Sequence, residues 1–238
     1  MMTNAMIFDF GQTLVDSAEG FRLAEKQAET RIFKDLALGS WSEFLTEYRR
    51  LRKDFHAKSN FSRKALWQAV YRHYNQEPNT ILVSREEDNY WETIAYKTRL
   101  FPETKSVLKQ LALSYRLALI TNTQGQESSR EHRFSLFPEL ENLFEVLIVA
   151  GVNNIPPKPD PIPFLTCLER LGVDPVNAIY VGDDWRIDIC GAKAAGIQPV
   201  WLKHHSISRN WPLIENPGPT IINLEQLLDL ENIGFPNR

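Results

Sequence analysis

Short apolar segments of strand character alternate with helical segments along most of this chain of 238 residues. Six of these segments are β-branched or aromatic and are bounded by polar or turn residues, which predicts β-strands. They are Ala5–Phe8, Leu117–Thr121, Val146–Ala150, Ala178–Val181, Pro199–Leu202 and Thr220–Ile222. Strands that alternate with helices imply right-handed crossovers, so the pattern predicts an α/β fold with a doubly wound, mostly parallel sheet.

Four segments between or after these strands carry apolar residues at helical spacing. They are Val107–Leu113, Ile162–Leu171, Ile187–Ala195 and Leu224–Leu230. Gly172 and Gly196 directly follow two of them, and glycine just past the last helical residue is a common stop signal. The segment His204–Pro219 is polar and contains Asn and Pro, which is typical of a surface loop.

Residues 16–98 interrupt this alternation, because they carry helical patterns and almost no strand signal. Their apolar residues predict four helices, around Phe21–Ile32, Phe44–Leu51, Ala65–Tyr74 and Tyr90–Ala95. We interpret Trp41, Trp67, Tyr71 and Trp91 as core residues of this bundle, and Asp16 as the cap of its first helix. The predicted organisation is an α/β core of residues 1–15 and 99–238 with a helical insert of residues 16–98.

The composition, with 43% hydrophobic and 24% charged residues, is ordinary for a soluble globular protein. No segment approaches the ~18–20 apolar residues that cross a bilayer, and the N-terminus lacks a signal-peptide pattern. Cys167 and Cys190 are isolated, and we expect them to be small buried residues in a reducing cytosol. A net charge of −3 argues against a nucleic-acid partner. These features predict a cytoplasmic monomer or homodimer with neither nucleic-acid nor membrane partners.

A basic stretch between Arg49 and Lys64 departs from this balance, since it holds seven positive residues and one acid, Asp54. One interpretation is a solvated helix face. The other is a surface that faces an anionic substrate.

Polar residues follow several of the predicted strands, in four segments of the chain. These segments hold Asp9 with Thr13, Thr121 with Asn122, Lys158, and the trio Asp183, Asp184 and Asp188. Taken singly each segment is weak evidence, since acids cap helices as readily as they bind metals. In an open α/β sheet, however, ligands bind at the carboxyl edge of the strands. The four segments therefore predict a site at that edge.

The order and spacing of these four segments resemble the four motifs of the haloacid dehalogenase superfamily. The resemblance extends to Leu100–Thr104, which is similar to the return from a cap to the core, and to Pro199–Leu202, which is similar to the strand after the fourth motif. It covers nearly the whole core and leaves only the helical insert unmatched. It implies a Rossmann-like core, and the place of the insert resembles the C1-type helical cap of that superfamily.

The resemblance implies a Mg²⁺-dependent hydrolase acting on a small phosphorylated substrate. By the family pattern, Asp9 is the nucleophile that forms an aspartyl-phosphate, and Mg²⁺ is held by Asp9, the Gly11 carbonyl and Asp183. Lys158 pairs with Asp9 and the phosphate, while the Thr121 hydroxyl and the Asn122 backbone amide bind phosphoryl oxygens. Supporting residues then complete the expected site: Asp188 orients Lys158 or a metal-bound water, Asp184 is a further metal-site acid or a helix cap, and Thr13 braces the loop.

Gly11 stands where the phosphatases of this superfamily carry a second Asp, which protonates the leaving group and then activates water. Such acid–base help is worth ~10²–10⁴-fold, so its loss leaves three alternatives. The first is a phosphohydrolase that works without this group. The second is other family chemistry, either dehalogenation, which uses no metal, or phosphonate cleavage by a cap lysine such as Lys53, Lys58 or Lys64. The third is a weakly active or non-catalytic binding protein. Gln12 departs from the pattern too, because it replaces the Gly that often precedes the Thr. A turn that requires positive φ at this position disfavours Gln.

Overall fold

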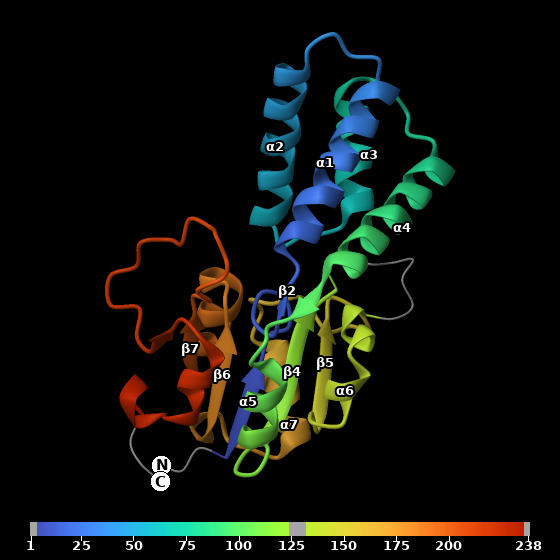
Figure 1. The fold of residues 1–238 in the computed structure, drawn as a ribbon. Helices are drawn as coiled ribbons and strands as arrows, with labels where there is room; N and C mark the ends of the chain where they lie inside the picture. The colour runs from blue at the N-terminus through green and yellow to red at the C-terminus, as the bar shows by residue number, and fades with distance from the viewer. Residues whose placement is uncertain (1–3, 124–131, 236–238) are drawn as a thin grey trace. The chain divides into compact units, whose positions relative to one another are not determined.

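Strand β1 (Ala5–Phe8) lies in the middle of a six-stranded sheet in which all neighbouring strands are parallel (Figure 1). The computed structural model describes residues 4–123 and 132–235. The strand order is β5-β4-β1-β6-β7-β8. The remaining strands are β4 (Arg116–Asn122), β5 (Val146–Ala150), β6 (Ala178–Gly182), β7 (Gln198–Leu202) and β8 (Thr220–Ile221). The predicted doubly wound parallel sheet is confirmed, and its strand order reverses between β1 and β6, where such sheets bind ligands.

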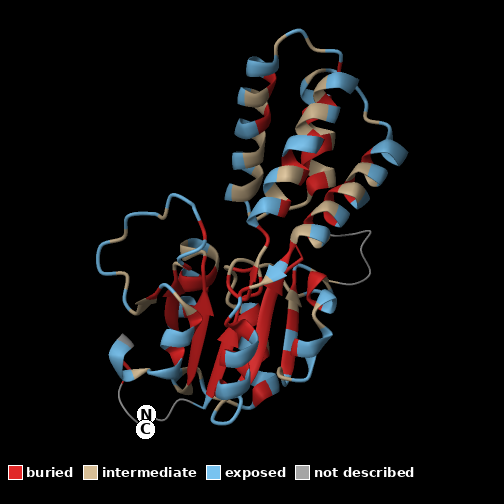
Figure 2. Ribbon diagram, in the orientation of Figure 1, coloured by how far each residue is buried: buried red, intermediate tan, exposed pale blue. Residues whose placement is uncertain are grey.

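Helices cover both faces of this sheet because the side chains of β1 alternate between two apolar clusters. Met6 and Phe8 belong to the cluster that includes residues of α5 (Thr104–Leu111) and of the 3₁₀ helix η4 (Leu224–Leu228). Ile7 belongs to the other cluster, which includes residues of α7 (Ile162–Leu171) and of α8 (Cys190–Ala194). The strands are accordingly buried, and the helices expose their outer sides (Figure 2).

Helix ends in the core differ in part from the sequence prediction. Helix α7 begins and ends as expected, and Gly172 follows it in the left-handed conformation with a φ of 61°. The segment predicted as a helix from Ile187 instead begins earlier, with a π-helical turn η3 (Trp185–Ile189) that leads into α8. The C-terminal segment η4 is 3₁₀-helical rather than α-helical, because it is a single short turn capped at Asn223.

The chain leaves and re-enters the core through a pair of short strands that the sequence did not predict. Strands β2 (Val15–Asp16) and β3 (Arg99–Leu100) pair antiparallel, with Asp16 opposite Arg99. The interpretation of Asp16 as a helix cap was wrong, because this ladder holds Asp16 and the helix begins after Ser17. Asp16 therefore belongs to the core and not to the insert, which shifts the first boundary by one residue.

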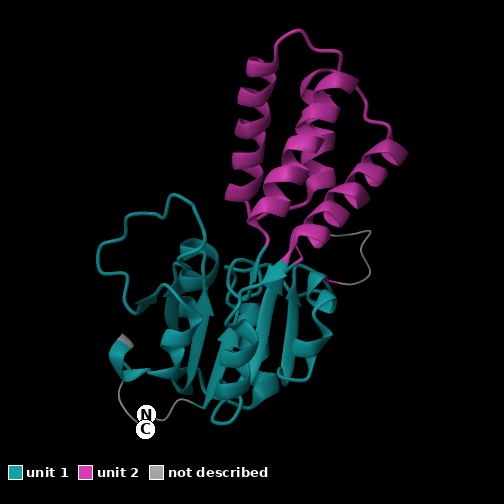
Figure 3. Cartoon of the chain, in the orientation of Figure 1, with its two compact units in different colours: residues 1–16, 99–122, 133–238 teal, residues 17–98, 123–132 magenta. Residues whose placement is uncertain are grey.

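The chain divides into two units, and among the described residues the second comprises Ser17–Thr98, Thr123 and His132 (Figure 3). The second unit contains four helices: α1 (Ala18–Asp35), α2 (Trp41–Ala57), α3 (Arg63–His73) and α4 (Thr80–Lys97). Side chains of Ser40, Ser62 and Asn79 accept hydrogen bonds from the first turns of α2, α3 and α4. Trp67, Tyr71 and Trp91 are buried as predicted. Trp41 is not, because it opens α2 and packs edge-on against Phe33 with 38% of its surface exposed.

A buried ion pair lies inside this helical bundle and involves part of the basic stretch. Glu25 Oε1 accepts a hydrogen bond from Tyr48 at 2.9 Å and lies 3.0 Å from Arg52 Nη1, while Glu25 Oε2 accepts from Arg63 at 3.2 Å. Tyr90 also donates to Glu25 at 2.9 Å. Arg63 therefore belongs neither to a solvated helix face nor to a surface for an anionic substrate, because its guanidinium pairs with Glu25 inside the bundle.

Two further expectations concern exposure. Cys167 is fully buried, whereas Cys190 is exposed, contrary to the prediction, since it begins α8 on the side away from the sheet cluster. Within the described ranges, the structure contains no helix with the length and apolar character needed to cross a membrane.

Candidate active site

Asp9 follows β1 directly, so the central strand delivers its carboxylate to the carboxyl edge of the sheet. Its backbone N–H donates to the carbonyl of Val181 at 2.9 Å, which extends the pairing of β1 with β6 by one residue. The hydroxyl of Thr13 donates to Asp9 Oδ2 at 3.3 Å, and Thr13 itself is fully buried. Thr13 thus holds the loop after Asp9 against the carboxylate.

Lys158 lies in the loop between β5 and α7 and reaches Asp9 from that loop. Its Nζ donates to Asp9 Oδ1 at 2.7 Å and to Asp188 Oδ1 at 2.7 Å. It also donates to the Tyr180 hydroxyl at 2.8 Å and to the Ile120 carbonyl at 3.0 Å. Burial disfavours the ammonium, but Asp188 and Asp9 outweigh burial and raise the pKa of Lys158 above its ordinary value. Lys158 is therefore a fixed positive charge beside Asp9.

Asn122, at the end of β4, fixes the backbone of Lys158. Its Oδ1 accepts the Lys158 N–H at 2.9 Å, and its Nδ2 donates to the Lys158 carbonyl at 3.2 Å. The sequence predicted a role only for the backbone amide of Asn122, and nothing in it indicated this reciprocal pair of side-chain hydrogen bonds. Thr121 is buried in β4 immediately before it. The carboxyl end of β4 consequently positions the lysine.

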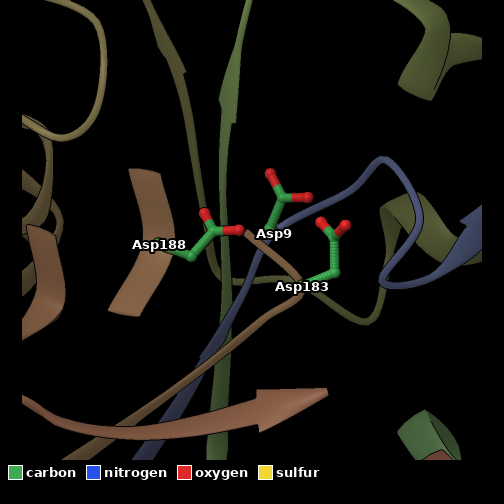
Figure 4. Close-up of side chains that lie close together, drawn as sticks. All are labelled: Asp9, Asp183 and Asp188. Carbon is green, nitrogen blue, oxygen red and sulfur yellow. The ribbon is translucent and has the colours of Figure 1, made fainter. Parts of the chain in front are cut away.

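Three carboxylates converge beside this lysine. Asp9, Asp183 and Asp188 each offer an oxygen, and these oxygens lie within 4.8 Å of one another (Figure 4). Burial raises the pKa of Asp9 to about 6, although the attraction of Lys158 opposes the shift. Burial, followed by repulsion from Asp188, raises the pKa of Asp183 well above its usual range. Close buried acids repel one another, so the cluster favours a further cation.

Asp188 is held on both of its oxygens. Oδ1 accepts from Lys158 and, at 3.0 Å, from the Tyr180 hydroxyl, while Oδ2 accepts the backbone N–H of Asp184 at 3.0 Å. A Cβ on Gly182 would lie 2.5 Å from Asp188 Cβ, so only glycine lets β6 end this close to Asp188. Asp188 is thereby directed at the lysine.

Asp184 caps the π-helical turn. Its Oδ1 accepts the backbone N–H of Ile187 at 2.9 Å, which is the second of the two alternatives predicted for it. In the same segment, Asp183 belongs to the carboxylate cluster, and its backbone carbonyl accepts the indole N–H of Trp201 at 2.9 Å.

This geometry agrees with a family match over most of the core. The family model for haloacid dehalogenase-like hydrolases matches residues 3–196. The chain belongs to this family of hydrolases.

Among curated relatives of this hydrolase, glyceraldehyde 3-phosphate phosphatase from Pyrococcus abyssi is 29% identical over 85% of the chain and 82% of the relative. Among solved structures, a 2-haloacid dehalogenase from Pseudomonas syringae is 27% identical, with a TM-score of 0.66 over 97% of this chain and 99% of that one. A HAD phosphatase from Thermococcus onnurineus superposes with a TM-score of 0.67 at 23% identity, over 97% of this chain and 98% of the other. The enzyme is thus similar both to phosphatases and to a dehalogenase.

The loop after Asp9 contains the two departures from the family pattern. Gln12 has a φ of 60°, the left-handed conformation that disfavours a side chain of this kind. Gly11 has room for a Cβ, whose nearest neighbour would be Nη2 of Arg133 at 3.7 Å. The space around position 11 would therefore accept the Cβ of a residue larger than glycine.

Two residues of the hydrolase site were not predicted from the sequence. Tyr180 lies in β6, where an apolar strand masks its role, and Arg209 lies in the loop after β7. Nη1 of Arg209 donates to Asp183 Oδ2 at 2.5 Å. Tyr180 carried no signal beyond strand character, and Arg209 none beyond its charge.

The residues at the site suit a magnesium ion. Asp9 and Asp183 offer carboxylate oxygens, the hard ligands that Mg²⁺ prefers. Asp188 is less suited to direct ligation, because Lys158, Tyr180 and Asp184 already engage it.

Proposed function

We propose that the protein is a Mg²⁺-dependent phosphatase that hydrolyses a small phosphorylated metabolite through an aspartyl-phosphate at Asp9. The observation that carries this proposal is the set of contacts at Lys158, whose Nζ lies 2.7 Å from Asp9 and 2.7 Å from Asp188. Asp183 completes the acid cluster on the other side. A nucleophilic carboxylate needs nearby positive charge, here Lys158 and a metal ion held by the acids, because the phosphate that it attacks is also an anion.

In this mechanism the Asp9 carboxylate attacks phosphorus, and the ester P–O bond breaks. Lys158 offsets the repulsion between carboxylate and phosphoryl group, and Asp188 with Tyr180 keeps its ammonium in place. When bound by Asp9, Asp183 and the Gly11 carbonyl, Mg²⁺ supplies further positive charge for the phosphoryl oxygens. We assign the Thr121 hydroxyl and the Asn122 backbone amide to those oxygens. Water then hydrolyses the aspartyl-phosphate and regenerates Asp9.

The leaving oxygen receives no proton from residue 11, because Gly11 has no side chain. In this proposal its proton comes from water, so the rate should depend steeply on how well the leaving group bears negative charge. We infer that the substrates turned over fastest carry acidic leaving groups. The relatives named as glyceraldehyde 3-phosphate phosphatases support a small sugar phosphate as the natural class.

A leaving-group series tests this function. We expect hydrolysis of aryl phosphates to rise with the acidity of the phenol, to be slower for glyceraldehyde 3-phosphate and other alkyl phosphates, and to stop with EDTA. Asp9→Asn removes the nucleophile and serves as the blank. Turnover that persists in EDTA would contradict the metal assignment.

Dehalogenation is the second candidate, and the likeness to the 2-haloacid dehalogenase favours it. The position of Asp183 beside Asp9 favours the phosphatase, since that pair supplies carboxylates to a metal. Release of chloride from 2-chloropropionate in EDTA, with no phosphate release from any ester, would support the dehalogenase instead.

A further inference from the structure

Arg209 forms an ion pair with Asp183, which the proposed function assigns as a metal ligand. Its Nη1 lies 2.5 Å from Asp183 Oδ2, and its Nη2 lies 3.5 Å from the Asp183 carbonyl. One guanidinium thus contacts Asp183 through the side chain and the backbone. Asp183 is nearly buried, with 7% of its side chain exposed, whereas 31% of the Arg209 side chain is exposed. The contact therefore joins a buried acid to a cation that retains access to solvent.

The loop that carries Arg209 is attached to the core on both sides of the guanidinium. Before it, His204 contacts Glu103 at 2.8 Å and stacks on Phe101 with ring centroids 3.6 Å apart. After it, the Trp211 ring lies 4.2 Å from Arg209 Cζ. Trp211 in turn packs edge-on against Trp201, at 6.1 Å. Arg209 is consequently held by an aromatic surface as well as by Asp183.

The charges of the cluster show why a cation is present there. Among the described residues, the ion pairs of Asp9, Asp183 and Asp188 are to Lys158 and Arg209. With all three acids counted as carboxylates, three formal negative charges thus meet two positive ones. A divalent ion at Asp9 and Asp183 would bring the sum to +1 with both cations in place, and it would meet the guanidinium across one carboxylate. Two positive charges on either side of a single carboxylate, the metal ion and the guanidinium, repel strongly in a partly buried site.

We propose that Arg209 competes with the divalent metal for Asp183. In the metal-free protein the guanidinium neutralises Asp183, and metal binding displaces it from the carboxylate and alters its contact with Trp211. This inference rests on the proposed metal site. It makes Arg209 a residue that sets metal affinity without touching the phosphoryl group.

Calorimetric titration of Mg²⁺ into the full-length protein tests the proposal without an activity assay. We expect Arg209→Gln to tighten the Mg²⁺ dissociation constant about tenfold, the scale of one charge-assisted hydrogen bond. Arg209→Lys, which keeps the charge but not the fork geometry, should tighten it less. Lys203→Gln is the matched control, because Lys203 lies over Trp201 at 3.9 Å and not on the carboxylate. It should leave the constant within about twofold, because the Lys203 ammonium lies on an indole ring and not on an acid of the cluster.

Tryptophan fluorescence gives the second readout. Mg²⁺ should change the emission of the wild type, and Trp211→Phe or Arg209→Gln should remove most of that change. A dissociation constant that is unchanged or weaker in Arg209→Gln would overturn the proposal, because Arg209 would then hold Asp183 ready for the metal. Mg²⁺ binding with the expected ranking but no phosphate release would contradict the proposed function alone. Absence of Mg²⁺ binding in both wild type and Arg209→Gln would overturn both proposals.

Discussion

Arg133 places its Nη2 3.7 Å from the point where a Cβ on Gly11 would lie. Arg133 itself is buried, and its Cζ lies 5.8 Å from the Phe10 ring centre. The space next to the nucleophile loop that a second acid would enter is therefore bordered by a guanidinium. This arrangement determines what restoring the acid would do.

The Cβ that Gly11→Asp adds should fit, because its 3.7 Å distance to Arg133 is an ordinary contact distance. The added carboxylate would meet Arg133, and a neighbouring positive charge lowers the pKa of an acid and makes it a poorer proton donor. We expect a gain of only a few fold in kcat on alkyl phosphates for the single variant.

Combining Gly11→Asp with Arg133→Met should raise kcat on alkyl phosphates further, up to about 10²-fold, because the new acid no longer faces a guanidinium. Steady-state kinetics on an alkyl and an aryl phosphate measure both effects, with Gly11→Ala as the control for added bulk. Equal gains on the two substrates would argue against proton donation as the cause.

Asp188→Asn removes one of the two carboxylates that hold the Lys158 ammonium. We expect kcat to fall about 10²-fold or more, since the lysine ammonium loses a partner that aligns it with Asp9. Asp160→Asn is the matched control, because the Asp160 side chain accepts the backbone N–H of Ile162 at the start of α7 and an asparagine oxygen can accept it as well. A rise in KM with kcat unchanged would show that Asp188 acts on binding and not on the transition state.

Gly182→Ala tests how closely β6 must approach Asp188. The new Cβ would lie 2.5 Å from Asp188 Cβ and Cγ, and Asp188 is held by hydrogen bonds on both oxygens. We expect a loss of about 1–3 kcal/mol in the free energy of unfolding, together with a lower kcat. Gly39→Ala provides the comparison, since nothing lies within 4 Å of its Cβ position. Urea unfolding of the two variants should show a clear difference in midpoint.

The sheet was predictable because each long strand carries its signal locally, as a buried apolar run ended by polar residues. Strands β2 and β3 were not, since two residues are too few to show a period. Asp9, Lys158 and Asp183 were recognisable because strand ends and motif order place them at one edge. Tyr180 and Arg209 were not, because one belongs to an apolar strand and the other to a polar loop whose path depends on tertiary contacts. Trp41 was misjudged for a related reason, as hydrophobicity alone does not distinguish the rim of a bundle from its centre.

Glu25 makes the stability of the helical unit depend on pH. Burial alone would raise its pKa, but Arg63, Arg52 and the tyrosine hydroxyls outweigh burial and lower the pKa below the ordinary value of 4.5. An acid with a depressed folded-state pKa stabilises the folded state above the unfolded-state value, and this contribution is lost as the pH falls through the folded-state pKa. The loss should therefore begin near pH 4.5 and grow below it.

Glu25→Gln should cost about 3 kcal/mol near neutral pH, because the buried Arg63 loses its charged partner. The difference from wild type should shrink as the pH is lowered from 4.5, where the wild-type carboxylate becomes protonated as well. Glu92→Gln, at an exposed position of α4, should leave stability within about 0.5 kcal/mol at every pH. Chemical unfolding followed by circular dichroism between pH 7 and pH 3 measures these differences. A gap between Glu25→Gln and wild type that stays constant over this range would mean that the Glu25 carboxylate does not titrate with folding.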